Sequence, residues 1–430
     1  MRWNSKLRCY LAQISKSTKN FLRFSLYHAL VLSFVFFSSC ARTSDPRRLI
    51  IWHQMRVDER MVLEDQIRQF MSLNPGVRVE ALYKETEELR SSFIIAAIAK
   101  QGPDLVYGPS DQIGPFQAMN IIAPLEDLFK IEWLDSFNPK ALTWYQGHLY
   151  QIADKLGNHL TLVYNKKLVP RPPETDVELI ELGKKLTVDK DGDGKTDQFG
   201  LVWNYTEPFF FIPFMSGFGA WVMDEDGRPT LNSPGMVDAL QFIKDLRDKY
   251  RIIPPEADYN SADAMFIEGK AAMIINGDWS WAGYRKAGID VGIAPLPKIT
   301  KTGKWCAPMI SPKGYSVNVN LPEEKIPLLV KFLRFIMDPN RQLQTAKALQ
   351  TMPTRTVLYE DPFIKNNEIL VNSQKQIDRG KPMPVVPELR AIWDAMRASY
   401  QAVLGGAKSP AAAARDMQAL ALRKIAEMNE

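Results

Sequence analysis

A short acidic segment, residues 189–197, has the spacing of a cation-binding loop. Side-chain oxygens at its first, third, fifth and ninth positions, with Gly194 at the sixth, match the start of a calcium loop. The twelfth position is Gly200, so the bidentate glutamate that completes such a loop is missing. Two interpretations stay open, a calcium site and a solvated turn. The candidate ligands are Asp189, Asp191, Asp193 and Asp197.

A pair of carboxylates could instead perform hydrolysis. Glycoside hydrolases hold two carboxyl groups about 5 to 10 Å apart across the scissile bond, and Asp111 and Glu207 are candidates for such a pair. The sequence contains no Gly-x-Ser-x-Gly nucleophile motif, no phosphate-binding loop and no dinucleotide fingerprint. The carboxylate pair therefore leaves an extracytoplasmic glycoside hydrolase as the alternative function.

Cysteine and histidine are too few for metal or disulfide chemistry. The three cysteines are Cys9, Cys40 and Cys306, of which only the last falls in the body of the chain. The four histidines have no ligand spacing, which argues against a zinc enzyme.

A third pattern consists of aromatic residues that follow a glycine or a proline at the end or start of a secondary-structure element. Trp279 and Trp281 follow the strand-ending pair Asn276-Gly277, and Trp393 lies in a helix pattern that begins after Pro387. A flat aromatic face suits the apolar C–H face of a pyranose ring, whose hydroxyls then need fixed donors and acceptors. Tryptophans at such spacing also serve as core packing, so spacing alone does not decide between the two roles.

The elements that would position these residues alternate between strands and helices. Such alternation predicts a mostly parallel sheet, with ligands beyond the carboxyl ends of its strands. Tyr107, Asp111 and Gln112 hold that position after the third strand. We expect strands at 48–52, 77–81, 102–107 and 161–167, a hairpin at 145–150, and helices at 60–73, 87–100, from 177, at 326–337 and through most of 388–430.

Length and charge bound the class of protein. A chain of 430 residues exceeds one compact core and suggests two domains. Its net charge of +5 comes from residues 1–39, which hold six basic side chains and no acidic one, so the remainder is close to neutral. No basic surface for nucleic acid is expected.

The first 39 residues have the pattern of a secretory signal peptide. A basic start precedes an apolar run around residues 26–37, too short to span a bilayer comfortably. Phe37-Ser38-Ser39-Cys40 resembles a bacterial lipobox, which predicts lipidation of Cys40 and a lipidated tether over residues 40–47. Plain cleavage and an uncleaved anchor are the alternatives. The expected localisation is periplasmic or extracytoplasmic, with the chain held at the membrane as a lipoprotein.

The order of motifs over residues 48–430 resembles the maltose-binding-protein group of bacterial extracellular solute-binding proteins. Residues 383–393, Met383-Pro384 through Trp393, are the segment most similar to that group. The other matching motifs are Gly102-Pro103-Asp104, Tyr164-Asn165-Lys166, Pro172-Pro173, Phe266 with Gly269 and Ala272-Met273, Gly277 with Trp279, and Pro295-Leu296-Pro297.

This resemblance implies an α/β, two-lobed periplasmic-binding-protein fold of type II, with a hinge and a ligand cleft between the lobes. Lobe I would comprise residues 48–156 and 310–358, and lobe II residues 157–309 and 359–430. The implied function is capture of an oligosaccharide or glycoside and delivery to the permease of an ABC importer. Such a protein performs no catalysis, requires no cofactor and is expected to be a monomer.

The resemblance also assigns ligand-binding roles. Trp279 and Trp393 match stacking tryptophans of the family, Trp281 lies close by, and Phe209 replaces a tyrosine in a Glu-Pro-Tyr motif. Asp111 matches an acidic sugar ligand. The expected ligand-binding set is Tyr107, Asp111, Gln112, Asn158, Glu207, Phe209, Trp279, Trp281, Trp393 and Arg397.

The polar groups around the stacking residues differ from those of the maltose group. Gln112 stands in place of an arginine, Asn158 in place of a glutamate, and Arg56-Val57 in place of an aspartate and a lysine. Because hydroxyl contacts decide sugar specificity, the resemblance also allows a ligand other than maltose, such as a non-maltose disaccharide or a glucosylated polyol.

Overall fold

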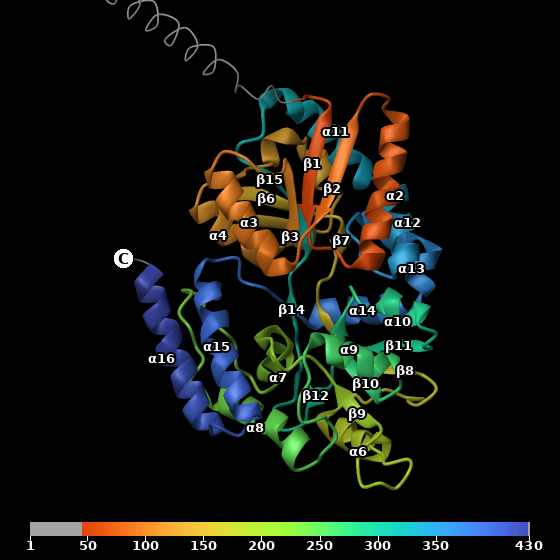
Figure 1. Ribbon diagram of the computed structural model, residues 1–430, viewed down its shortest axis with the longest axis vertical. Coiled ribbons are helices and arrows are strands. Elements are labelled where there is room, and N and C mark those ends of the chain that lie inside the picture. Colours follow the sequence, from red (N-terminus) through yellow and green to blue (C-terminus); the bar gives the residue numbers. More distant parts are fainter. Residues whose placement is uncertain (1–44, 429–430) are drawn as a thin grey trace, which may run out of the picture. The chain divides into compact units, whose positions relative to one another are not determined.

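The computed structural model describes residues 45–428, drawn in colour in Figure 1. The expected signal peptide, Cys40 and most of the tether lie outside the described residues. The described part contains two mixed sheets, each covered by helices. We refer to each sheet with its helices as a lobe.

The sheet of lobe I has the strand order β2-β1-β3-β15-β6-β5, with β4 added beside β15. β1, β2 and β3 are parallel, as the alternation of strands and helices predicts. Its strands are β1 (Arg48–His53), β2 (Arg78–Tyr83), β3 (Leu105–Pro109), β4 (Ile122–Ala123), β5 (Leu142–Tyr145), β6 (His148–Ala153) and β15 (Lys313–Asn318); its helices are α2 (Val57–Leu73), α3 (Thr86–Ile98), α4 (Ile113–Ala118), α5 (Ile131–Leu134), α11 (Ile326–Ile336) and α12 (Pro339–Leu349).

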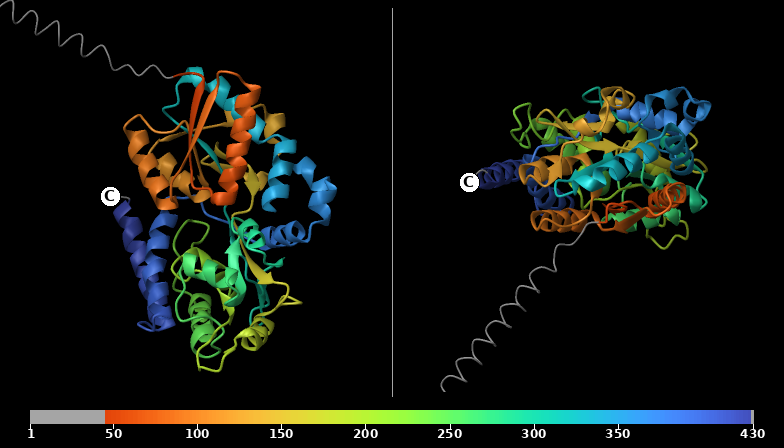
Figure 2. Two further views of the ribbon diagram at one scale, coloured as in Figure 1. Left: turned by 45° about the vertical axis from the view of Figure 1, so that its right-hand side comes forward. Right: turned by 90° about the horizontal axis from the view of Figure 1, so that it is seen from above.

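The sheet of lobe II has the order β11-β8-β10-β9, and all seven residues of β10 are buried. The C-terminal helices α15 and α16 pack side by side against this lobe (Figures 1 and 2). Its strands are β8 (Leu160–Asn165), β9 (Phe199–Val202), β10 (Ala271–Gly277) and β11 (Val291–Ala294); its helices are α6 (Asp176–Leu186), α7 (Ile212–Gly217), α8 (Pro234–Asp248), α9 (Tyr259–Ile267), α10 (Trp281–Lys286), α13 (Pro362–Asn366), α14 (Glu368–Arg379), α15 (Glu388–Leu404) and α16 (Pro410–Met428).

Short two-stranded ladders occur where the chain passes from one lobe to the other. β7 (Lys155–Leu156) pairs with β16 (Met352–Pro353), and β14 (Met309–Ile310) pairs with β17 (Lys381–Pro382). A third ladder, β12 (Lys298–Ile299) with β13 (Lys304–Trp305), lies within lobe II. Paired crossings of this kind suit a hinge, because they hold the connections together while leaving each lobe its own core.

The expectation of a mostly parallel sheet was wrong for both lobes. In lobe I, β15 runs antiparallel to β3, β4 and β6, and β5 and β6 form an antiparallel hairpin. In lobe II, β8 is antiparallel to both β10 and β11. The reason is connectivity: β15 returns from the far part of the chain, and a tight turn at Gln146 and Gly147, both at positive φ, closes the hairpin.

Helix starts follow capping chemistry in the sequence. Thr175 begins α6 by accepting the Glu178 N–H, Ser233 begins α8 by accepting the Met236 N–H, and Asp258 begins α9 with a capping box through Ser261. Apolar side chains then converge on separate cores. One contains residues of 160–309 and 383–421, and another contains residues of 49–152 and 315–337. The exact lobe boundaries given above remain a prediction.

No helix among residues 45–428 has both the length and the apolar character needed to cross a membrane.

Candidate functional site

A cavity of about 350 Å³ lies between the lobes and takes its walls from both. This size falls within the usual range of small-molecule sites. Lobe I contributes Gln54, Arg56, Glu85, Thr86, Glu87, Pro109, Asp111 and Lys313; Asn158 comes from the crossing segment; lobe II contributes Asn204, Glu207, Phe209, Phe210, Tyr259, Trp279, Met383, Arg390, Trp393 and Arg397.

The aromatic wall of the cavity belongs to lobe II. The rings of Phe209 and Trp279 lie 6.4 Å apart between centroids, and the Trp279 Nε1–H donates to the Tyr259 hydroxyl at 3.0 Å. Gly277 makes this arrangement fit, because a Cβ at that position would lie 2.1 Å from the Trp279 ring. The glycine that ends β10 is therefore what lets the indole fold back over the strand and face the cavity.

One face of α15 supplies a tryptophan and two arginines. Residues 390, 393 and 397 recur at helical spacing, so their side chains share a face. Trp393 is 7% exposed and lines the cavity. Arg397 donates to both carboxylate oxygens of Glu207, at 3.1 and 3.3 Å. Arg390 reaches across to lobe I and donates to Glu87 at 2.8 and 3.1 Å. These bidentate pairs fix the guanidinium groups at the edge of the cavity.

Asp111 has the most unusual environment in the cavity. It follows β3 in the 3-10 turn Ser110–Gln112, at the carboxyl end of the strand where the sequence predicts ligand contacts. Its Oδ1 atom is buried and has no hydrogen-bond partner. Burial raises the pKa of the Asp111 carboxyl to about 6, although the Arg390 charge opposes this shift. A desolvated acceptor without a partner is costly, and a ligand hydroxyl would satisfy it.

Asn158 reaches the cavity through an uncommon backbone conformation. It lies between β7 and β8, where the chain enters lobe II, with φ of 50°. Few side chains other than asparagine and aspartate adopt this region readily. The sequence resemblance places a glutamate here in the maltose group, so the replacement exchanges a carboxylate for an amide that the local turn favours.

Three of the residues expected from the sequence do not line this cavity. Tyr107 is fully buried, and its hydroxyl donates to Asp154 at 2.9 Å because its side chain points to the core side of β3. Trp281 is fully buried as the first residue of α10, on the inward face of that helix. The Gln112 side chain lies against Gly108 and borders an adjoining hollow of about 40 Å³, which shares Asp111 and Trp393 with the cavity.

The cavity also contains residues that the sequence did not single out as ligand contacts. Arg390 was detectable, because it precedes Trp393 by three positions and Arg397 by seven on one helix face. Arg56 and Tyr259 face each other across the lobes, with the guanidinium carbon 4.4 Å from the ring centroid. Lys313 begins β15, and nothing in the local sequence marks it.

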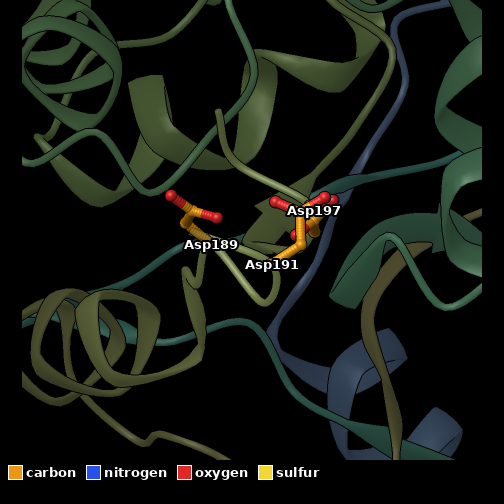
Figure 3. A group of neighbouring side chains, drawn as sticks. All are labelled: Asp189, Asp191 and Asp197. Carbon is orange, nitrogen blue, oxygen red and sulfur yellow. The ribbon is translucent and has the colours of Figure 1, made fainter. Parts of the chain in front are cut away.

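The acidic turn of residues 189–197 is exposed except at its end, where Asp197 is half-buried, and none of its residues lines the cavity. Carboxylate oxygens of Asp189, Asp191 and Asp197 lie within 4.8 Å of one another (Figure 3). Asp193 is outside this group and accepts from the Lys195 N–H at 2.8 Å. Both Asp189 oxygens accept backbone N–H groups, from Gly192 at 2.7 Å and Gly194 at 2.8 Å, and these bonds lower the Asp189 pKa. The carboxylates thus already stabilise the turn.

A larger hollow of about 610 Å³ lies beside the start of α15, where Pro384, Val386 and Glu388 border it. Tyr145 and Trp221 are its aromatic residues, and the acidic turn at residues 224–227 forms one side. The Asp224 carboxylate is occupied in that turn, since it accepts from the N–H groups of Asp226 and Arg228. The smaller cavity has more aromatic surface and an unsatisfied acceptor, so we take it as the candidate site.

The family model described as bacterial extracellular solute-binding protein matches residues 65–372, more than half of the chain. The chain belongs to this family. As a solute-binding protein it is a component of transport and not an enzyme, and the family requires no cofactor. The family resemblance drawn from the motif order is therefore confirmed, and the glycoside hydrolase alternative is not supported.

Individual relatives agree with this assignment. The solute-binding protein is similar to the maltose/maltodextrin-binding domain MalE from Bdellovibrio bacteriovorus bound to maltotriose, with 48% identity, a TM-score of 0.84, and coverage of 88% of this chain and 99% of that one. This likeness confirms the α/β periplasmic-binding-protein fold. The maltotriose-binding protein of Pyrococcus abyssi is 28% identical over 363 residues, which cover 83% of this chain and 77% of the relative.

A third relative is named for its place in transport. The maltooligosaccharide ABC transporter solute-binding lipoprotein of Streptococcus pneumoniae is 25% identical over 321 residues, which cover 73% of this chain and 74% of the relative.

Proposed function

We propose that this solute-binding protein captures a maltooligosaccharide in the cavity between its lobes. The observation that most supports the proposal is the opposition of an aromatic wall on lobe II to the unpartnered Asp111 oxygen on lobe I. A sugar ring presents apolar C–H faces and hydroxyl edges, and this cavity offers a partner to each. The relatives named for maltotriose and maltooligosaccharides give the ligand class.

In this proposal the residues divide into two roles. Trp279, Trp393 and Phe209 stack on sugar rings, while Asp111, Asn158 and the Glu207–Arg397 pair bond to hydroxyls. The charges that line the cavity balance, which suits a neutral ligand. The four basic residues are Arg56, Lys313, Arg390 and Arg397, and the four acidic residues are Glu85, Glu87, Asp111 and Glu207.

Delivery follows from closure of the two lobes. A ligand that contacts both lobes stabilises the closed form over the open one. The closed protein would then present both lobes to the permease of an ABC importer, as the name of the pneumococcal relative suggests. We further propose that lipid on Cys40 holds the protein at the membrane outside the cytoplasm, as the lipobox pattern predicts.

Calorimetry of the mature protein against maltose, maltotriose, maltotetraose, trehalose, sucrose and glucosylated polyols tests the ligand. We expect the tightest binding for an α-linked glucose oligosaccharide, and no product when the mixtures are analysed after prolonged incubation. Tightest binding to a non-maltose disaccharide or a polyol glycoside would overturn the ligand class. Release of glucose, abolished in an Asp111→Asn variant, would restore the hydrolase alternative.

For the acidic turn, we propose the solvated-turn interpretation over a calcium site. The support is the set of backbone N–H groups that its exposed carboxylates already accept. A calcium ion would have to share these oxygens with the backbone N–H groups and would lack the glutamate that normally completes the loop.

A further inference from the structure

Lys313 occupies a position in the cavity that the ligand-binding residues expected from the sequence do not include. It is the first residue of β15 and pairs with Pro109 of β3, so it lies next to the turn that holds Asp111. Its side chain extends from lobe I toward lobe II. The Lys313 Nζ atom lies 5.0 Å from the ring centroid of Trp279, the central residue of the aromatic wall.

The Lys313 ammonium has no fixed partner within residues 45–428. Arg390 and Arg397, the arginines of α15, are held by carboxylates, but no hydrogen bond or ion pair is formed by Lys313 there. An ammonium has three N–H donors on a flexible stem of four carbons. The cation–π contact with Trp279 uses its charge and leaves those donors available to a ligand.

Two buried carboxylates explain why a charged side chain rests at this point. Burial raises the pKa of Asp278 to about 6, and the charge of Lys313 is the strongest influence that opposes this shift. Burial also works against ionisation of Glu59, but the charges of Lys155 and Lys313, with hydrogen bonds from Lys155 and the Arg56 backbone, lower the Glu59 pKa to about 2. The ammonium is thus attracted to two buried carboxylates that lie outside the cavity lining, and it is bonded to neither.

We propose that Lys313 is a ligand-binding residue that donates to a hydroxyl of the sugar ring stacked on Trp279. This inference rests on the proposed sugar-binding function and adds to it a donor from lobe I. A pyranose on the indole presents its hydroxyls around the edge of the ring, and the lysine stem is long enough to move from the ring face to that edge. Because Lys313 belongs to lobe I and Trp279 to lobe II, a sugar that contacts both residues also links ligand binding to closure of the two lobes.

The position of Lys313 also accounts for a gap in the sequence comparison. The sequence resemblance implies that Val57 stands where the maltose group has a lysine, and therefore that an ammonium has been lost. Lys313 supplies an ammonium to the same cavity from a different strand. A charged donor to a sugar hydroxyl contributes more than a neutral one, so the contact affects affinity.

The test is calorimetry with maltotriose on Lys313→Met, which keeps the stem and removes the donors. We expect binding to weaken about tenfold, with Lys313→Arg recovering part of the loss. If Lys313 instead only covers Trp279 until sugar arrives, Lys313→Met will bind more tightly, and that result overturns the proposal. Unchanged affinity overturns it as well. Lys331→Met, an exposed lysine on α11 of the same lobe, is the matched control and should bind as the wild type does.

Maltotriose analogues that each lack one hydroxyl separate direct contact from a structural effect. If Lys313 donates to one hydroxyl, the analogue without it will bind wild type and Lys313→Met equally. If the lysine acts only through Asp278 and Glu59, the variant will lose the same factor with every analogue, which contradicts the proposal. Failure of wild type to bind any maltooligosaccharide would count against the proposed function itself. Binding by wild type with no effect of Lys313→Met would count against this inference alone.

Discussion

Replacement of Asp111 by asparagine should stabilise the unliganded protein while weakening sugar binding. The carboxylate lines the cavity with one buried oxygen that has no partner. In the unliganded state this oxygen lowers the stability of the folded protein, because desolvation disfavours its charge. In the complex it becomes an acceptor for ligand hydroxyls. The substitution keeps the shape of the side chain and removes the charge, so it separates the two effects.

The pKa gives the size of the stability effect. Burial raises the Asp111 pKa from its ordinary value of 3.8 to about 6. This rise in pKa corresponds to at most about 3 kcal/mol at neutral pH, because solvent around the half-buried Asp111 screens part of the effect. The folded state holds its proton more tightly than the unfolded state, so the penalty is fully present above about pH 6. It disappears as the pH falls toward the unfolded value of about 4.

The effect on binding has the opposite sign. A hydrogen bond to a charged group contributes about 1.5 to 3 kcal/mol. Loss of one such bond in Asp111→Asn therefore weakens binding about ten- to a hundredfold at pH 7.5. Sugar hydroxyls also favour the ionised carboxyl and lower its pKa on binding. Affinity of the wild type should accordingly rise between pH 5 and pH 7, and this rise should be absent in the variant.

Thermal unfolding at pH 7.5 and pH 4.5, with calorimetry of maltotriose binding, measures both effects. We expect the midpoint of Asp111→Asn to exceed that of wild type by a few degrees at pH 7.5 and by less at pH 4.5. Asp135→Asn, an exposed residue of the same lobe, is the control and should change neither property. A lower midpoint at pH 7.5 would show that Asp111 is satisfied in the folded state. Unchanged affinity would remove it from the ligand contacts.

Three further predictions concern other parts of the chain. Trp279→Ala or Trp393→Ala should weaken sugar binding by about 2 to 3 kcal/mol in calorimetry with little loss of helical signal, since each removes a stacking face; normal binding in both would reject the aromatic wall as the site. Cys40→Ser should release the protein from the membrane fraction with binding intact, whereas retention would indicate an uncleaved anchor. A chelator should leave the melting temperature of wild type and of Asp191→Ala/Asp193→Ala unmoved; a fall in wild type alone would establish a calcium site.

Much of lobe I and the starts of α2, α3, α6, α11 and α15 could be predicted from local sequence. The sequence predicts β1, β2, β3, α2 and α3 because the spacing of apolar residues changes between strand and helix periods, and because turn residues such as Asn74-Pro75-Gly76 separate the elements. The direction of β15 could not be predicted, because its partners β3 and β6 are separated from it by the whole first segment of lobe II. Strand pairing between distant segments depends on tertiary packing, which local periodicity does not encode.

The candidate site shows the same division. Three local signals place residues in the cavity. Asp111 follows the end of a strand, Trp279 follows Gly277, and Trp393 lies on one face of a helix. Tyr107 precedes Asp111 by four residues and points into the core, since side chains alternate along β3 and the strand ends between them. Trp281 follows Trp279 by two residues but belongs to α10, whose inward face buries it. A shift of two positions changed exposure from cavity to core.

The polar groups around the aromatic wall show why substitution at single positions is a weak guide to specificity. The sequence resemblance implies that Gln112 and Val57 replace charged residues of the maltose group, which alone would suggest a cavity poor in cations. The structure has Arg390 and Lys313 in the cavity instead, from α15 and β15. A ligand responds to the position of a donor in space and not to the strand that supplies it. Under the proposed function, the aromatic wall sets the sugar class, and the cations from α15 and β15 set the order of preference within it.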